Sequence, residues 1–193
     1  MTATRRVLLL GVAGLGAAAM TGCAGDDGGT PALMTSPYAD PARAAAHGAA
    51  LERLLVDAYD AALRRAEDGE VGAVPPAVTA LLEACRDHHR DHRAAWSATP
   101  APTQLGIARQ TLRDIGRTSS VTELAKVLEP LEDLAAQTYT ATVAQTQDGK
   151  VAGTAARILP VEAGHQAVLR FVTAQYPVPA QQIGTTRALP PGS

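Results

Sequence analysis

The segments LERLLVDAY, residues 51–59, and LEDLAAQTY, residues 131–139, share a leucine, a glutamate, a second leucine and a final tyrosine at equivalent positions. In each segment the apolar residues recur at helical spacing, and one glutamate, Glu52 or Glu132, lies in the middle of the apolar stripe. A carboxylate in that position loses much of its hydration, which is costly unless a partner compensates. Two matching cases indicate a duplicated helical hairpin with a shared polar site.

Capping and turn residues around these segments predict four long helices. Asp40-Pro41 begins the first helix, which ends at Asp68-Gly69, and Pro75-Pro76 begins the second. The capping box Ser120-Val121-Thr122-Glu123 begins the third helix, and Asp148-Gly149 separates it from the fourth. No segment shows the alternation expected of a strand. The helices are expected to end near residues 67, 100, 147 and 176.

The lengths of the connections predict how the helices are arranged. The first and last connections are short, so each joins two helices into an antiparallel hairpin. The middle connection, residues 99–119, is long enough to cross the bundle even with a short helix near 104–115. The sequence therefore predicts an all-α, antiparallel four-helix bundle of ferritin-like topology, with one long crossover between its second and third helices.

The second and fourth helices carry groups that can partner the two glutamates. On the fourth helix Glu162 and His165 are three residues apart and share an apolar face. On the second helix His92 lies at the centre of the apolar stripe, flanked by His88 and His89. Aligning the two hairpins pairs His92 with His165 and His89 with Glu162, which favours His89 over His88. Together with the two glutamates, this is the arrangement of a dinuclear carboxylate site.

From about residue 44 to residue 173 the chain resembles the ferritin-like domain proteins of bacteria, which are often exported. The resemblance is strongest in LEDLAAQTY with ILPVEAGH at 158–165, and in LERLLVDAY with HHRDH at 88–92. It implies a metal site beside Tyr59 and Tyr139. The implied ligands are Glu52, His89, His92, Glu132, Glu162 and His165, with His88 as a weaker candidate.

One position departs from the pattern of the family. His89 stands where dinuclear iron proteins of this architecture usually carry a bridging glutamate. Three carboxylates and three imidazoles offer less negative charge to two iron ions, and suit copper, zinc or a single ion better. The expected cofactor is one or two divalent transition-metal ions, with iron, copper, zinc and manganese all left open. The alternative is a metal-free polar layer, in a bundle that serves as an envelope interaction or structural module.

The N-terminus is typical of an exported lipoprotein. Arg5-Arg6 followed by an apolar run fits a twin-arginine signal, and Met20-Thr21-Gly22-Cys23 resembles a lipobox with a lipidated cysteine. The mature protein is thus expected on the outer face of the cytoplasmic membrane, held by the lipid on Cys23. The predicted organisation is a signal at 1–23, a flexible tether at 24–38, the bundle at 39–176 and a Pro-rich tail of low order at 177–193.

Composition and charge narrow the classes of partner. Removing Arg5 and Arg6 from the 17 basic residues leaves 15 against 19 acidic ones, and no basic stripe occurs, so nucleic acid is not expected. With Cys23 lipidated, Cys85 has no disulfide partner and is interpreted as a small buried hydrophobe. The sequence leaves open whether the protein is an enzyme, has a protein partner or forms a homo-oligomer.

Overall fold

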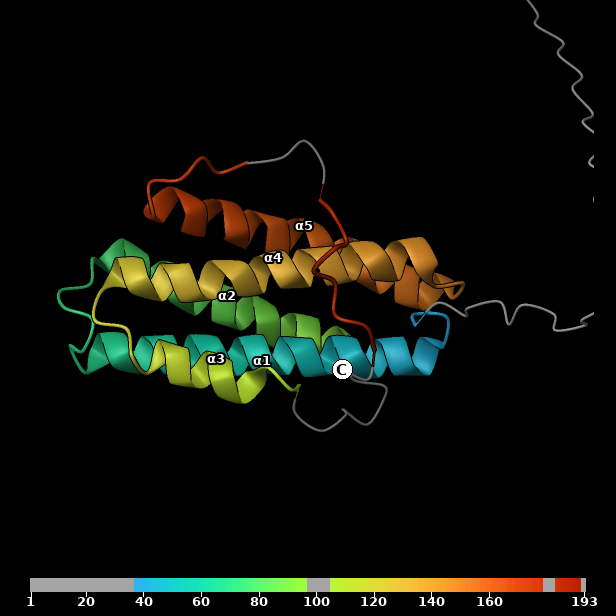
Figure 1. Cartoon of the computed structure of the whole chain (residues 1–193), viewed down its shortest axis with the longest axis horizontal. Coiled ribbons are helices and arrows are strands. Elements are labelled where there is room, and N and C mark those ends of the chain that lie inside the picture. Colours follow the sequence, from blue (N-terminus) through green and yellow to red (C-terminus); the bar gives the residue numbers. More distant parts are fainter. Residues whose placement is uncertain (1–36, 97–104, 179–182, 192–193) are drawn as a thin grey trace, which may run out of the picture. The chain divides into compact units, whose positions relative to one another are not determined.

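Long helices dominate the computed structural model, which describes residues 37–96, 105–178 and 183–191 (Figure 1). In these residues there are five helices and no strand, which confirms the all-α prediction. In chain order they are α1 (Pro41–Glu67), α2 (Pro76–Ala95), α3 (Ala108–Ile115), α4 (Val121–Gln145) and α5 (Gly149–Val172).

Three of the helices begin at the side-chain caps that the sequence predicts. The Asp40 carboxylate accepts hydrogen bonds from two backbone N–H groups in the first turn of α1, and Asp148 does the same for α5. The Ser120 hydroxyl accepts from the N–H of Glu123 at the start of α4, while the Glu123 carboxylate accepts from the N–H of Ser119. These local contacts explain why the predicted helix starts are accurate.

The end of α2 differs most from the prediction. This helix ends at Ala95 rather than near residue 100, with Trp96 as its C-cap residue. Trp96 is only 3% exposed, and its indole lies directly over Gly48 of α1 and stacks on Tyr139 of α4. The end of α2 therefore coincides with packing of Trp96 against α1 and α4. No helix-stop residue near Trp96 predicts this end from the sequence.

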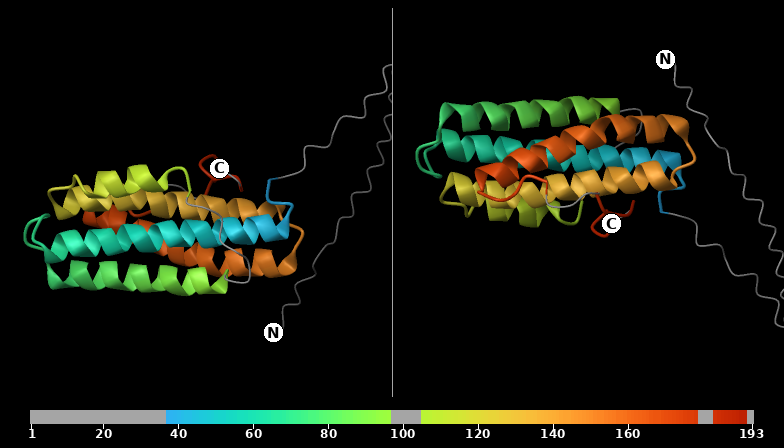
Figure 2. Two further views of the ribbon diagram at one scale, coloured as in Figure 1. Left: turned by 90° about the horizontal axis from the view of Figure 1, so that it is seen from below. Right: turned by 90° about the horizontal axis from the view of Figure 1, so that it is seen from above.

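The two hairpins are α1 with α2 and α4 with α5, and most close packing lies within each pair. The colour order in Figure 1 shows that α2 and α4 run in the same direction, with α1 and α5 opposed to them. The connection between the hairpins returns along the bundle through α3, which contacts α1 and α4 (Figure 2). This is the predicted ferritin-like topology with its long crossover.

Both helices of the second hairpin contain an internal proline. α4 continues through Pro130, which is half-buried, and α5 continues through Pro160, which is exposed. Glu132 and Glu162, two residues further along, are fully buried. The prolines therefore leave both helices intact and leave these two glutamates inside the bundle.

The C-terminal residues 183–191 lie against the bundle, although their composition alone predicts low order. The Leu189 carbonyl accepts a hydrogen bond from the Tyr38 hydroxyl at 2.6 Å, and the Leu189 N–H donates to the Thr138 hydroxyl at 3.1 Å. The N–H of Arg187 donates to the Gln137 side chain at 2.9 Å. Two backbone N–H groups of this irregular segment thus find hydrogen-bond partners in side chains of α4 rather than in other backbone groups.

The predicted signal at 1–23, with Cys23, and residues 24–36 of the predicted tether lie outside the described residues. Within the described part of the chain, no helix is both long enough and apolar enough to span a membrane.

Candidate metal centre

The structure brings together all six side chains that the sequence proposes as ligands. They come from all four long helices and meet inside the bundle. Four of them, the three glutamates and His89, are 0% exposed. The six are Glu52 of α1, His89 and His92 of α2, Glu132 of α4, and Glu162 and His165 of α5.

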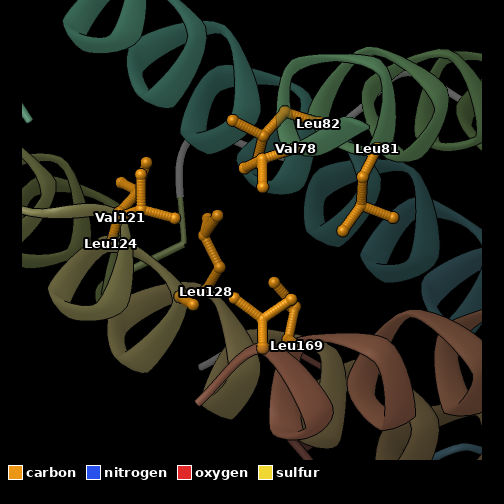
Figure 3. Close-up of a pocket in the computed structure, with 9 residues that line it drawn as sticks. Val78, Leu81, Leu82, Val121, Leu124, Leu128 and Leu169 are labelled. Atoms are coloured by element: carbon orange, nitrogen blue, oxygen red, sulfur yellow. The ribbon is translucent and has the colours of Figure 1, made fainter. Parts of the chain in front are cut away.

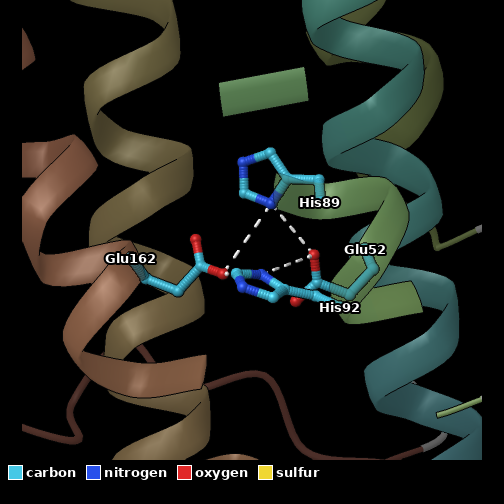
Figure 4. Close-up of side chains that lie close together, drawn as sticks. All are labelled: Glu52, His89, His92 and Glu162. Atoms are coloured by element: carbon cyan, nitrogen blue, oxygen red, sulfur yellow. Dashed lines mark hydrogen bonds and ion pairs between the residues drawn. The ribbon is translucent and has the colours of Figure 1, made fainter. Parts of the chain in front are cut away.

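Four of these side chains form what we call the first ligand group, Glu52, His89, His92 and Glu162 (Figure 4). One oxygen or nitrogen from each lies within 4.8 Å of the others. His89 Nδ1 is 2.9 Å from Glu52 Oε2, and His92 Nδ1 is 2.8 Å from Glu162 Oε1. Two carboxylates and two imidazoles therefore surround one point in the interior.

The second ligand group consists of His89, Glu132, Glu162 and His165, again with donor atoms within 4.8 Å of one another. His89 Nε2 is 3.2 Å from Glu132 Oε1. His165 Nδ1 is 3.5 Å from Glu132 Oε2 and 3.7 Å from Glu162 Oε2. The two groups share His89 and Glu162, so they are two halves of one cluster.

The two tyrosines predicted beside the site connect the hairpins. The Tyr139 hydroxyl of α4 donates a hydrogen bond to Glu52 of α1, and the Tyr59 hydroxyl of α1 donates to Glu132 of α4. Each tyrosine is seven residues after one glutamate and bonds the other. The pair thus fixes Oε1 of each glutamate. In Glu52 the other oxygen, Oε2, faces His89, whereas in Glu132 Oε1 also faces His89 and Oε2 faces His165.

His88 lies outside both ligand groups. Its ring is exposed, and its Nδ1 is 2.9 Å from Nε2 of His165, with the two rings stacked at a centroid distance of 5.2 Å. The inner nitrogen of His165 faces the carboxylates while the outer nitrogen faces His88. His88 therefore orients His165, and the neighbouring His89 occupies the interior.

Cys85 is buried in the core, as its interpretation as a small buried hydrophobe predicts, and it also adjoins the site. The residue is 1% exposed, and its thiol adjoins the Tyr59 hydroxyl and the His165 ring, whose pKa values it helps to raise. Cys85 is four residues before His89, so it lies one turn away on the same helical face. This four-residue spacing was the feature of the sequence that could have placed Cys85 beside the site.

Burial and neighbouring charges shift the pKa values of the three carboxyl groups in different directions. Burial by itself raises the pKa of Glu52 and of Glu132, but the adjoining histidines outweigh it, so both pKa values are lowered. For Glu162, burial and then repulsion from Glu52 raise the pKa to about 7. Glu162 is therefore the carboxyl group that takes up a proton most readily.

The imidazoles carry the compensating positive charge. Burial tends to lower the pKa of each ring, but the carboxylates hold the pKa of His89 well above its usual value. The same competition raises the pKa of His92 to about 9. For His165, contact with Cys85 and then with Glu132 overcomes burial and raises the pKa to about 12. In the absence of other cations, protonated histidines balance the glutamates.

Protons alone do not satisfy the cluster. Among the described residues, several buried nitrogen and oxygen atoms of the cluster have no hydrogen-bond partner. The atoms close to them are not aligned for a hydrogen bond. A buried polar atom without a partner costs free energy that a coordinated cation would recover. The unsatisfied atoms are Nδ1 of His92, Nδ1 of His165, Oε2 of Glu132 and both carboxylate oxygens of Glu162. The donor set therefore fits transition-metal ions.

An apolar pocket lies close to the second ligand group, between α2, α4 and α5 (Figure 3). Its lining is aliphatic and includes Leu82, Leu128 and Leu169. Leu128 is four residues before Glu132, and Leu169 is four residues after His165, so the pocket is one helical turn from the cluster. A charged solute would find no polar partner in this lining.

Comparison with protein families matches residues 45–175 to the ferritin-like domain. No curated protein and no solved structure matches the chain. The matched range contains most of α1, all of the other helices and all six side chains of the cluster. With a buried histidine and glutamate cluster able to bind metal inside a bundle of this topology, the chain belongs to the ferritin-like domain family.

Proposed function

We propose that this protein is a membrane-anchored metal-binding protein of the cell envelope, with one or two transition-metal ions in the bundle core. The observation that carries the proposal is the convergence of three carboxylates and three imidazoles in the bundle core. Four of these side chains, Glu132, Glu162, His92 and His165, have buried atoms without a hydrogen-bond partner. Surface acidic clusters often occur without a metal, but these donors are in the interior, where their mutual repulsion and lost hydration need compensation.

Each ligand group can hold one ion. Glu52 and His92 belong only to the first group, and Glu132 and His165 only to the second. Sites that combine imidazoles with carboxylates suit copper, zinc or iron better than magnesium or calcium. When bound, such an ion would supply Lewis-acid or one-electron chemistry to a small reactant. The role proposed for the site is metal handling or redox chemistry at the cell surface.

The imidazole side of the cluster is its open side. The side chains of His92 and His165 are 13% and 8% exposed, whereas the carboxylates are fully buried. His88 lies further out on the same side. A cation entering from solvent would therefore meet the imidazole rings before it reaches the carboxylates, and it would displace the protons that these rings carry in the metal-free protein.

The test is to purify the protein from its own cell envelope, measure its metal content, and compare melting temperatures with chelator and with added divalent metals. Metal binds only the folded site, so we expect the melting temperature to rise with metal and fall with chelator. Glu132→Ala should weaken this response, because it removes a carboxylate that belongs only to the second ligand group. Glu83→Ala, which changes an exposed carboxylate of α2, should leave it intact.

The competing function is a metal-free interaction or structural module of the envelope. The raised pKa values of His92 and His165 favour it, because protonated rings can neutralise the carboxylates without a metal. A melting curve that neither chelator nor any divalent transition metal shifts, in a protein purified without bound metal, would establish this alternative.

The membrane anchor is part of the same proposal and rests on the Arg5-Arg6 and Met20–Cys23 patterns. A twin-arginine signal carries folded cargo, which allows metal to be loaded before export. Changing Arg5 and Arg6 to Lys should stop export, and Cys23→Ala should release the protein from the membrane fraction. Normal export of the double Lys variant would show that the chain is translocated unfolded.

A further inference from the structure

His89 is the one imidazole of the cluster with both ring nitrogens directed at carboxylates. Its Nδ1 is 2.9 Å from Glu52 Oε2, and its Nε2 is 3.2 Å from Glu132 Oε1. Glu52 belongs only to the first ligand group and Glu132 only to the second. The His89 ring therefore stands between the two groups, with one nitrogen on each side.

The other two histidines of the cluster have a different orientation. His165 turns Nδ1 inward to Glu132 and Glu162, and its Nε2 outward to His88. His92 likewise directs Nδ1 at Glu162 and Glu52. These rings face one ligand group each, as terminal ligands do.

Glu162 divides its two oxygens between the groups in the same way as His89 divides its nitrogens. Oε1 is 2.8 Å from His92 Nδ1 in the first group, and Oε2 is 3.7 Å from His165 Nδ1 in the second. Each group thus has one glutamate and one histidine of its own, and shares one carboxylate and one imidazole with the other group.

We infer that the cluster is an imidazole-bridged dinuclear centre, in which His89 binds one metal ion through Nδ1 and a second through Nε2. The inference rests on the proposed metal-binding function and specifies the connection between the ions. Coordination through both nitrogens replaces every N–H proton of the ring, and these protons leave to solvent as the cations bind. Glu162 spans the same two ions through its carboxylate.

A shared imidazole has a consequence that two independent sites lack. The ring transmits exchange coupling between paramagnetic ions on its two nitrogens, so the state of one ion affects the other. It also holds the ions in a fixed relation, because His89 is 0% exposed and is packed against the Tyr59 ring at a centroid distance of 5.3 Å.

The experiment is a titration of the metal-free full-length protein with Cu(II), followed by electron paramagnetic resonance. We expect two ions to bind, and the second to convert the signal of isolated Cu(II) into that of a coupled pair, with loss of integrated intensity per ion on cooling. Replacing the second equivalent of Cu(II) by diamagnetic Zn(II) should restore the isolated signal.

Two variants identify the bridging group. His89→Gln should lose the coupling, while Glu83→Gln, which changes an exposed side chain of the same helix outside the cluster, should keep it. Glu162→Gln tests the other shared ligand and leaves His89 in place, so coupling should persist in this variant even if His89→Gln does not fold. Circular dichroism checks the helical content of each protein.

The results separate this inference from the proposed function. Two bound Cu(II) ions with isolated signals, a single bound ion, coupling that survives in folded His89→Gln, or coupling that Glu162→Gln abolishes would each overturn the imidazole bridge and leave metal binding intact. A protein that binds neither Cu(II) nor any other transition metal would overturn both.

Discussion

Tyr139 of α4 donates a hydrogen bond to Glu52 of α1, so the two hairpins are joined inside the cluster itself. Tyr59 of α1 makes a second hydrogen bond between the hairpins by donating to Glu132 of α4. Both tyrosines and both glutamates are at most 1% exposed. The ligands are therefore positioned by the opposite hairpin, and the stability of the bundle and the geometry of the site depend on the same contacts.

Tyr139→Phe should destabilise the metal-free protein. The substitution removes the Tyr139 hydroxyl, so a buried Glu52 oxygen loses its hydrogen bond, and the free energy of unfolding falls by about 1–3 kcal/mol. Tyr59→Phe should have a similar effect through Glu132. The measurement is urea unfolding in the presence of chelator, with Tyr176→Phe as the control because that side chain is exposed. Equal stability of Tyr139→Phe and wild type would mean that this hydrogen bond contributes nothing.

Gly48→Ala should disturb Trp96, the single tryptophan of the chain. A Cβ atom at Gly48 would lie 2.7 Å from the indole, so the ring must shift from its stack on Tyr139. We expect a loss of about 1–3 kcal/mol in stability and a changed tryptophan emission spectrum.

The matched control is Gly153→Ala in α5, where the new Cβ would meet only the Arg157 side chain at 3.6 Å. That variant should be as stable as wild type or gain up to about 1 kcal/mol, because alanine favours the helix. Unchanged fluorescence and stability in Gly48→Ala would contradict the close packing of Trp96 on α1.

Thr138→Val tests the docking of the C-terminal residues. The Thr138 hydroxyl donates to the Leu134 carbonyl and also accepts from the Leu189 N–H at 3.1 Å. Thr140 makes the equivalent bond to Ala136 within α4. We therefore expect Thr138→Val to be about 1 kcal/mol less stable than Thr140→Val, with faster amide hydrogen exchange at Leu189. Identical exchange in the two variants would show that this contact does not hold the segment.

His47 should make the stability of the bundle depend on pH. Burial lowers the pKa of His47 from 6.5 to about 4, and the charge of Arg43 adds to this, although a hydrogen bond with the Leu189 backbone opposes it. The unfolded chain therefore binds a proton between these two values while the folded protein does not. Stability is fully present above pH 6.5 and falls by up to about 3 kcal/mol as the pH drops towards 4.

The measurement is the free energy of unfolding of wild type and His47→Gln at several pH values, with chelator present throughout. The difference between the two proteins isolates His47 from the histidines of the cluster. We expect wild type to lose stability relative to His47→Gln as the pH falls through this window. Parallel pH curves would mean that His47 is not buried in its neutral form.

The helices could be predicted because their signals are local. Asp40, Ser120 and Asp148 cap the first turns that follow them, and Gly69 with φ 73° turns the chain after α1. The same locality placed Glu52 and Glu132 on buried faces, because helical periodicity is set by residues within two turns. The predicted end of α2 was wrong, because the helix ends where Trp96 packs on α1 and α4, and these contacts are not local in the sequence.

The site could be predicted only in part. The spacing of Glu162 and His165 fixes that they share a face, and the repeat favoured His89, which the structure places in the interior. The crossed hydrogen bonds of Tyr59 and Tyr139, and the proximity of Cys85 to His165, could not be read from the sequence. They depend on how one hairpin is rotated and shifted against the other.

By itself the sequence determined the helices, the long crossover and the faces that carry carboxylates and imidazoles, since each follows from residues close together in the chain. Only the tertiary structure decided that His89 lies between Glu52 and Glu132 while His88 stays outside. It also decided that Leu189 docks on Tyr38 and Thr138. These contacts join residues far apart in the chain, so they depend on packing between helices. Helical periodicity is a property of neighbouring residues and carries no information about that packing.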